Sequence, residues 1–383
     1  MNKLFTSESV TPGHPDKLCD QISDNILDEY LKGDPYSRVA CEVCAHKNGI
    51  VVMGEISSKA IVNLEKIIKK TILDIGYNNN NLGFNGNNVK IDIFITNQSR
   101  DISCGVDNSL DDNNIGAGDQ GMMFGYATNE TDAYMPYPIF IAHKLSKKLT
   151  EVYKNKEINY LRPDGKTQVT VLYEDDIPKF IDTIVLSTQH APVDIDVLRK
   201  DIKEFIIDKV IPLNMINNNT KILINPTGRF VIGGPVADSG LTGRKIIVDT
   251  YGGICGHGGG AFSGKDSTKV DRSASYYARY VAKNIVAAGL CDRIEIQVSY
   301  AIGLSQPISI YINTFNTNKI SEDKILSAIT EVFDFTPNNI INELNLRKPI
   351  YHKTTCFGHF GKKGLPWEKL DKVSEIKKYI KSS

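Results

Sequence analysis

Residues 13–17 read Gly-His-Pro-Asp-Lys and gather a histidine, a carboxylate and a lysine in one short segment. Proline suits the first turn of a helix, and apolar residues at helical spacing follow it. His14 and Asp16 are therefore expected at a helix N-terminus, where free backbone N–H groups favour phosphate. The segment predicts a phosphate site.

Asp16, Asp20, Asp24 and Asp28 recur at every fourth position and therefore share one face of that helix. Such a row of carboxylates is typical of a solvated acidic face. We expect this for Asp20, Asp24 and Asp28. Asp16, beside a histidine and a lysine, is equally consistent with metal ligation.

Residues 116–121 (GAGDQG) match the G-x-G-x-x-G pattern of dinucleotide-binding folds. The context does not fit, because residues 111–114 are no buried strand and Gly125 interrupts the helix that should follow. Glycine does allow a close backbone approach to a ligand. The segment is therefore interpreted as a tight loop that holds Asp119 towards a ligand.

Residues 259–266 (GGAFSGKD) nearly match a P-loop, but Asp266 replaces the Ser or Thr that binds magnesium, and no entering strand precedes the glycines. A glycine-rich turn still exposes N–H groups that favour an anion. A strand is expected over 246–250 and a helix over 267–288, with Gly289 as its stop. Basic residues and one carboxylate near this loop predict a polyphosphate-plus-metal site, and surface charge beside a structural turn is the alternative: Arg244, Lys245, Lys265, Lys269 and Asp271.

Cys41 and Cys44 form a C-x-x-C pattern, which could indicate zinc or redox chemistry. They lie in a strand-like segment, where residues three positions apart point to opposite faces. Since no second C-x-x-C completes a zinc site, two unpaired strand cysteines are expected.

The elements around these motifs repeat a strand pair followed by a helix, which predicts three similar α+β units with a helix on each antiparallel sheet. Two asparagine-rich segments, 78–88 and 108–114, are expected to be loops whose composition cannot pack a core. The strand pairs and following helices are 39–45, 50–57 and 59–75; 167–173, 179–188 and 194–210; and 293–301, 308–315 and 321–333.

Charge and composition narrow the class of protein. The 383 residues include 45 Lys+Arg and 45 Asp+Glu, and this balance argues against a nucleic-acid or membrane-surface binder. No apolar run reaches the roughly 20 residues of a membrane helix, and the N-terminus lacks a secretory h-region. Seven scattered cysteines suit reduced thiols in the cytoplasm.

Five segments together resemble the signatures of S-adenosylmethionine synthetases (methionine adenosyltransferases): 13–17, 116–127, 224–230, 238–245 and 259–266. The likeness runs from residues 4–9 to 358–361. It implies an α+β fold of three similar domains, each an antiparallel-rich sheet covered by helices, around a pseudo-threefold axis. The expected boundaries are 1–101, 114–231 and 232–372.

The resemblance implies that ATP, L-methionine and water give S-adenosylmethionine, phosphate and diphosphate, by attack of the methionine sulfur on C5′ and later hydrolysis of tripolyphosphate. His14, Lys265 and Arg244 would be catalytic, and His14 would contact the leaving oxygen. The phosphate chain would be bound by Lys166, Arg244, Lys245 and Lys265, and the nucleoside by Asp164, Arg229, Phe230, Asp238 and Ala261, with Asp119 nearby.

Methionine would be held by Glu55, Gln98, Asp238 and Lys269, with Lys265 close by. Asp16 and Asp271 would hold magnesium, two ions per site, and Glu42 would ligate potassium. The family's sites form between two subunits, which implies a homodimer, usually assembled into a homotetramer. Residues 98–108 resemble the loop that gates the site.

Two other classes stay open. A kinase or acyl-phosphate ligase could use the same phosphate-binding groups and would release ADP, or AMP with diphosphate. A catalytically silent partner of a true synthetase would have lost basic or metal-binding residues, and the sequence retains all of those named above.

Overall fold

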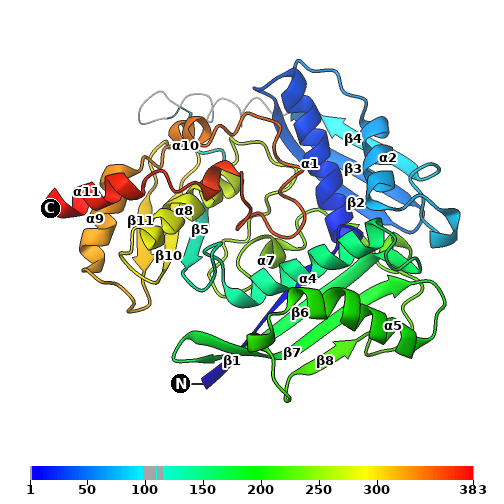
Figure 1. Ribbon diagram of the computed structural model, residues 1–383. Coiled ribbons are helices and arrows are strands. Elements are labelled where there is room, and N and C mark those ends of the chain that lie inside the picture. The colour runs from blue at the N-terminus through cyan, green and yellow to red at the C-terminus, as the bar shows by residue number, and fades with distance from the viewer. Residues whose placement is uncertain (1, 98–108, 110–114, 383) are drawn as a thin grey trace.

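The computed structural model describes residues 2–97, 109 and 115–382, and it contains three sheets with helices packed against them (Figure 1). One order of elements recurs, namely helix, hairpin, helix and, in the first two units, a final parallel strand. The first unit is α1 (Pro15–Gly33), β2 (Arg38–His46), β3 (Gly49–Ser57), α2 (Leu64–Ile75) and β4 (Lys90–Thr96).

The second and third units follow the same order. The second comprises α4 (Tyr137–Lys154), β6 (Leu161–Glu174), β7 (Ile177–His190), α5 (Ile195–Ile202), a π-helical turn (Lys203–Ile207), α6 (Asp208–Val210) and the parallel strand β8 (Lys221–Ile224). The third comprises α8 (Val270–Ala287), β10 (Arg293–Tyr300), β11 (Ser309–Asn313) and α9 (Glu322–Val332), followed by α10 (Pro337–Glu343) and α11 (Val373–Ser382).

Each unit contributes one strand to the sheet of the next unit. β1 (Asn2–Val10) pairs with β6, β5 (Gly121–Thr128) pairs with β10, and β9 (Gly240–Leu241) pairs with β2, always antiparallel. Figure 1 shows this as a blue strand beside green ones and a teal strand beside yellow ones. The exchange is cyclic, as expected for three similar units around a pseudo-threefold axis, and it interlocks the units.

A long helix covers one face of each sheet. α1 packs on β2 and β9, α4 on β6 and β1, and α8 on β5 and β10. The other face of each sheet carries exposed apolar side chains in this single chain, such as Phe94, Leu4 and Tyr311, which are 64%, 57% and 56% exposed. Every sheet therefore has one face packed under a long helix and an open face with exposed apolar side chains. The open face of the third sheet is covered at one end, where Tyr126 is 1% exposed and packs on Tyr251 and Phe315.

α1 begins as the sequence predicts. His14 is its N-cap residue, Pro15 follows in the first turn, and Asp16 places a carboxylate where the helix dipole favours negative charge. Its apolar stripe of Leu18, Ile22 and Ile26 is fully buried. His14 and Asp16 are therefore fixed by a helix end rather than by a loop.

Two predicted elements around the third motif are wrong. Residues 246–250 form no strand, because Ile246–Asp249 is a short helix, α7, closed by the hydrogen bond from Asp249 N to Lys245 O. α8 begins at Val270 and not at 267, because Asp266 accepts hydrogen bonds from Thr268 and holds residues 266–269 in a turn. The predicted stop is confirmed, since Gly289 has φ +82° just beyond α8.

The asparagine-rich segment 78–88 contributes to the core, against expectation. Its short 3₁₀ helix Asn80–Leu82 leads to Phe84, which is 3% exposed and packs edge-on against Tyr77. Leu82 is also buried. Two apolar side chains, Leu82 and Phe84, are enough to attach this segment to the core because both are buried against the first unit. Segment 108–114 lies outside the described residues except for Ser109.

Shorter 3₁₀ turns complete the chain: Leu213–Met215, Gly234–Val236 and Pro366–Glu368. None of the helices in the described ranges is long and apolar enough to span a membrane. The six cysteines of the described ranges have free thiols, and Cys41 and Cys44 behave as two strand residues, one buried and one half-buried.

Candidate active site

The start of α1 meets the turn before α7. Asp16 Oδ2 lies 2.5 Å from Lys245 Nζ, Asp16 Oδ1 accepts a hydrogen bond from Leu241 N at 3.0 Å, and Arg244 Nη1 lies 3.8 Å from the same oxygen. Burial opposes ionisation of Asp16, but these hydrogen bonds outweigh it and lower its pKa. Asp16 is therefore an ionised carboxylate between two cations.

His14 is neutral and its tautomer follows from its partner. Its Nδ1 accepts the N–H of Asp16 at 3.2 Å, so the ring proton resides on Nε2. Burial, together with Lys245 and Lys166, lowers the pKa of His14 to about 3. The imidazole can therefore donate a hydrogen bond from Nε2 throughout the neutral pH range.

Asp20, Asp24 and Asp28 are buried, at 0%, 0% and 2% exposure, so the expectation of a solvated acidic face is wrong. Each carboxylate accepts hydrogen bonds from backbone N–H groups of the third unit or its flanking loops. These hydrogen bonds offset the free-energy cost of removing the carboxylate from water. Asp20 accepts from Gly243 at 2.9 Å, Asp24 from Gly264 at 2.9 Å, and Asp28 from Tyr351 and His352, both at 2.9 Å. The row of aspartates on α1 anchors the loops that carry the basic residues.

The glycine-rich segment 259–266 presents one lysine–carboxylate pair. Lys265 Nζ lies 2.7 Å from Asp271 Oδ2, and a Cβ at Gly260 would collide with that carboxylate. Gly264 has φ +81° and abuts Cys41 O of β2, so no larger residue fits. Glycine is therefore required here for close approach, as the sequence suggested.

Asp266 and Lys269 stabilise the glycine-rich loop in this structure. The buried Asp266 carboxylate accepts a hydrogen bond from Val39 N at 2.7 Å and pairs with Lys269. Asp266 thus fastens the glycine loop to β2. Lys269, expected near methionine, is turned towards this carboxylate.

Two further predicted residues lie on the open face of the first sheet. Glu42 of β2 lies opposite Met53, and Glu55 of β3 lies opposite Ala40. Desolvation by its surroundings raises the pKa of Glu42, against the attraction of Lys265. Glu42 therefore lies near Lys265 and would gain from a bound cation.

One residue predicted for the nucleoside, Asp164, lies near the start of β6. Asp164 Oδ2 accepts Gly234 N at 2.8 Å, while its buried Oδ1 has no protein partner. Burial raises the pKa of Asp164 to about 6, with Lys166 opposing and Asp238 adding to the shift. An unpaired buried carboxylate oxygen is costly unless a ligand hydrogen-bonds to it.

Phe230 is held by backbone hydrogen bonds and Ala261 by the packing of its methyl group. Phe230 N donates to His190 Nε2 at 3.1 Å, and His190 N donates to Phe230 O at 3.0 Å. Ala261 packs against Gly243, where any Cβ would lie 2.5 Å from the Ala261 methyl carbon. This contact joins the glycine loop to the turn that carries Arg244 and Lys245.

The ion pairs formed by these residues fall into three groups. One joins Asp16 with Arg244 and Lys245, the second joins Lys265 with Asp271, and the third joins Lys269 with Asp266. Arg229, Asp238 and Lys166 have exposed side chains, and so does Asp119, whose carboxylate caps Gln120 N at 2.7 Å. Gln98 and segment 98–108, which the resemblance predicts to gate the site, lie outside the described residues.

Sequence reasoning missed two contributors, Arg272 and Gly243. Arg272 Nη1 donates to Asp24 at 2.6 Å and to Lys265 O at 3.2 Å, so it holds the peptide that carries the lysine. The four-residue spacing of the aspartates was a signal that this helix face is special. Only the fold shows which distant residues face it.

The carboxylates suit magnesium bound partly through a substrate. Within the described ranges, no group of three or more His, Cys, Asp or Glu side chains could enclose a metal ion. Mg²⁺ usually takes one or two carboxylates together with phosphate oxygens and water. Asp16 and Asp271, each already beside a lysine, fit that mode of binding.

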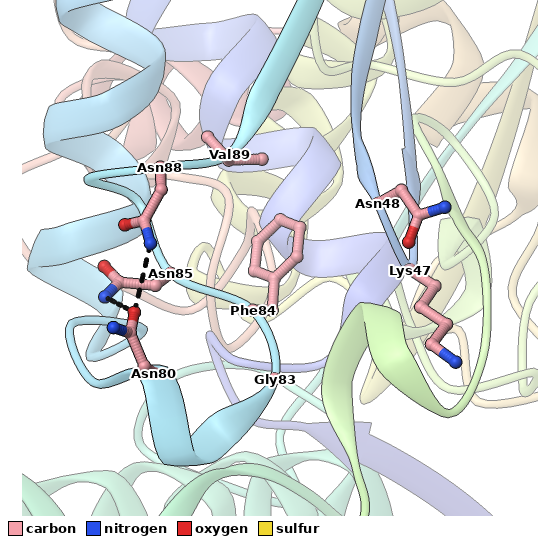
Figure 2. A pocket seen from close by; sticks show the side chains of 8 residues that line it. All are labelled: Lys47, Asn48, Asn80, Gly83, Phe84, Asn85, Asn88 and Val89. Carbon is pink, nitrogen blue, oxygen red and sulfur yellow. Dashed lines mark hydrogen bonds between the residues drawn. The ribbon is translucent and has the colours of Figure 1, made fainter.

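A hollow of about 370 Å³ lies apart from these residues, between the β2–β3 turn and the segment before β4 (Figure 2). The Asn80 amide oxygen there accepts hydrogen bonds from Asn85 at 2.7 Å and Asn88 at 3.2 Å. Figure 2 shows these amides turned towards one another. They fold the loop, and none of the predicted site residues lines the hollow.

Comparison with known proteins covers the whole chain. Residues 2–100, 114–230 and 232–369 match the N-terminal, central and C-terminal domains of S-adenosylmethionine synthetase. The chain is 58% identical to the S-adenosylmethionine synthase of Clostridium botulinum (strain Alaska E43 / Type E3) over 391 residues, which covers 99% of this chain and 100% of that protein. It is 56% identical to that of Finegoldia magna over 390 residues, with the same coverage. The chain therefore belongs to the S-adenosylmethionine synthetase family.

Proposed function

We propose that this methionine adenosyltransferase joins the sulfur of L-methionine directly to C5′ of ATP and then hydrolyses the released tripolyphosphate to phosphate and diphosphate. A thioether sulfur carries a lone pair and has no proton to lose, so the attack requires no general base. The barrier lies in the charge of the leaving group. Positioned cations and hydrogen-bond donors would therefore provide most of the catalysis.

The observation that carries this proposal is the pairing of each candidate magnesium ligand with a lysine, Asp16 with Lys245 and Asp271 with Lys265. Both pairs lie beside motifs that expose backbone N–H groups. Phosphate oxygens would draw the lysines and leave the carboxylates for a cation. A polyphosphate would thus pair with the two lysines, and magnesium would pair with the two aspartates. These four side chains form two ion pairs with each other in this structure.

His14 would donate from Nε2 to the oxygen that leaves C5′, because its Nδ1 is occupied by Asp16 N. Arg244, Lys245, Lys265 and Lys166 would bind the phosphate oxygens and stabilise the charge that develops on them. Magnesium, with two ions expected at Asp16 and Asp271, would supply further charge neutralisation. His14, Arg244 and Lys265 are the residues we assign to catalysis.

The nucleoside would lie near Asp164, whose free Oδ1 could accept a hydrogen bond from it. Arg229, Phe230, Asp238, Ala261 and Asp119 would complete its surroundings. Glu55, Gln98, Asp238, Lys265 and Lys269 would hold methionine. Glu42 would ligate potassium, because burial raises the pKa of this carboxyl group and a neighbouring cation would favour its ionised form.

The open face of the first sheet supports a homodimer with shared sites. Glu42 and Glu55 lie on it among Met53, Phe94 and Leu241, which are 43%, 64% and 41% exposed. Exposed apolar patches rimmed by polar groups mark protein interfaces. A second copy on this face would cover the patch and close the site, and such dimers would pair into a tetramer.

We further propose 1–101, 114–231 and 232–372 as the three domains and the cytoplasm as the location. The free thiols of the six described cysteines support a reducing compartment.

The test incubates the purified protein with MgATP, potassium and methionine and measures S-adenosylmethionine by mass spectrometry. Equal amounts of S-adenosylmethionine, phosphate and diphosphate are expected. A folded, dimeric protein that forms no S-adenosylmethionine would rule the proposal out. Release of ADP, or of AMP with diphosphate, would indicate a kinase or ligase instead.

The stereochemistry at C5′ tests direct attack separately. ATP carrying deuterium in one configuration at C5′ should give product of inverted configuration, as a single displacement requires. Retention would indicate a covalent adenosyl-enzyme intermediate and would overturn this step alone.

A further inference from the structure

A second cavity, of about 590 Å³, lies between α4 and the segment 353–363. Four exposed lysines line it, Lys144 and Lys147 from α4 and Lys353 and Lys363 from the segment. Among the described residues, none of these four forms an ion pair with a carboxylate, and no Asp or Glu lines the cavity. In a chain with zero net charge, this is a concentration of uncompensated positive charge.

The walls of the same cavity are apolar. Phe140, Phe357, Phe360 and Met135 line it, and Lys144 Nζ lies 4.2 Å from the centre of the Phe140 ring. Pockets that bind small organic molecules combine such walls with a few polar groups, in volumes of roughly 300–1,000 Å³. The cavity is therefore suited to a ligand with a flat apolar part and a negative charge.

The segment 353–363, which forms one wall of the cavity, has an unusual backbone conformation. Phe357 has φ 61°, a conformation that is costly for a bulky residue, and Gly358 follows at φ 78°. Lys362 Nζ donates to three backbone carbonyl groups, those of Lys353, Thr354 and Cys356, at 3.1, 2.9 and 2.5 Å. Lys362 thus organises the segment and leaves the other lysines free.

A buried polar group at the cavity has an unsatisfied atom. His143 lines the cavity, is 8% exposed and contacts Ser9 Oγ through Nδ1 at 2.8 Å, while its Nε2 has no protein partner. Burial and two lysines lower the pKa of His143 to about 3, so the ring is neutral. The Nε2 atom lies against Gly358, where an added Cβ would come within 2.5 Å of it, so the His143 ring forms part of the cavity wall.

We propose that this cavity is a binding site for an organic anion with an aromatic or flat apolar group, separate from the active site. Phe140 and Phe357 contact the flat part, and Lys144, Lys147, Lys353 and Lys363 bind the anionic group. None of the residues assigned to catalysis lines the cavity. The site is therefore independent of the proposed chemistry.

The test uses 1-anilinonaphthalene-8-sulfonate, an aromatic sulfonate whose fluorescence rises in apolar surroundings. The native full-length protein should bind one molecule per chain at this site. Lys147→Glu combined with Lys353→Glu should weaken binding by about tenfold or more, because two attractions become repulsions. The matched control, Lys200→Glu with Lys209→Glu at exposed lysines of the second unit, should bind within about twofold of wild type.

Two further measurements locate the probe. The Lys265→Ala variant should bind the probe as wild type does, and loss of binding there would place the probe in the active site and overturn the proposal. If the charge-reversal variant does not fold, wild-type binding should still weaken by several-fold as salt rises from about 0.02 to about 0.3 M. Equal binding by both double variants, or binding that is insensitive to salt, would also contradict the assignment.

Discussion

Both terminal nitrogens of the Arg272 guanidinium donate to the carboxylate of Asp24, at 2.6 and 2.7 Å, although the two residues are 248 positions apart in the chain. Neither side chain is exposed to solvent. Asp24 also accepts Gly264 N, and Arg272 also donates to Lys265 O. This one ion pair fixes α1, α8 and the peptide of Lys265 relative to each other.

Replacing Asp24 by asparagine should destabilise the fold strongly. The change removes the negative charge of the carboxylate that is paired with the buried Arg272 guanidinium. Breaking a buried ion pair in this way costs about 3–5 kcal/mol. Urea unfolding followed by fluorescence measures the loss. Asp74→Asn on the exposed face of α2 is the control and should change the unfolding free energy by less than about 0.5 kcal/mol.

A paired replacement separates charge from packing. Asp24→Leu with Arg272→Met exchanges the ion pair for apolar side chains and should recover part of the stability that Asp24→Asn loses. If Asp24→Asn were as stable as Asp74→Asn, the ion pair would not hold these elements together.

Much of the fold follows from local patterns. The three hairpins and the helices after them are predictable because alternating and helical spacings of apolar residues are local properties. The N-terminus of α1 is predictable because Pro15 and His14 are local signals. The strands β1, β5 and β9 could not be assigned to their sheets, since each pairs with a unit distant in sequence.

The candidate site shows the same division. His14, Asp16, Lys245, Lys265 and Asp271 are recognisable from motifs, and the structure groups them as two lysine–carboxylate sets. The burial of Asp24 was not predictable, because a solvated row of aspartates and a buried one have the same spacing. Whether Asp24 is buried or solvated depends on whether Arg272 and Gly264 lie against α1. Their position is a result of the packing of the first and third units, which local sequence does not reveal.

Replacing Lys265 by alanine should lower turnover by about 100-fold or more while the fold stays intact. Removing one preorganised donor to developing negative charge typically has an effect of this size. The Lys265–Asp271 pair is partly exposed, with 21% and 25% of the side chains accessible, so stability should change by less than about 1 kcal/mol. Steady-state kinetics and urea unfolding of the same preparation measure both quantities.

Lys200→Ala, on α5, is the control for Lys265→Ala and should keep wild-type turnover. Arginine at position 265 should recover only part of the activity, because its planar group cannot reproduce the ammonium geometry. A loss of stability in Lys265→Ala that matched the loss of turnover would favour a structural role for the loop.

The pH dependence of turnover should contain no acid limb from His14. The pKa of His14 is lowered to about 3, so the ring stays neutral as the pH falls from 9 to about 5. His14→Asn retains an acceptor for Asp16 N but misplaces the donor, so turnover should fall about tenfold to 100-fold at every pH. The measurement is kcat against pH for both proteins, whose profiles should be parallel. An acid limb near pH 6.5 in wild type that vanished in His14→Asn would contradict the neutral tautomer.

Replacing Phe94 by lysine should weaken self-association. The side chain is 64% exposed in the single chain and lies on the open face beside Met53, so its replacement should leave the protomer folded. A symmetric interface would then bury two new charges, which is costly. Sedimentation velocity should show a shift towards monomer and a parallel loss of activity. Leu213→Lys, at an 84% exposed position away from this face, should sediment as wild type; a dimer unchanged in Phe94→Lys would place the interface elsewhere.

Lowering the pH should destabilise the protein partly through His143. Burial lowers its folded-state pKa to about 3, whereas the unfolded value lies near 6.5. Between these two pKa values the unfolded chain binds a proton that the folded chain does not. The contribution of His143 to the unfolding free energy is therefore fully present above about pH 6.5 and is lost progressively as the pH decreases. From pH 7 to pH 5 this group alone should contribute a loss of about 2 kcal/mol.

Urea unfolding of wild type and His143→Gln at the two pH values measures this loss, because glutamine cannot take up the proton. The variant should be less stable at pH 7 through its lost contact with Ser9, yet it should lose less stability on acidification. Equal losses in the two proteins would mean that His143 takes up its proton in the folded state.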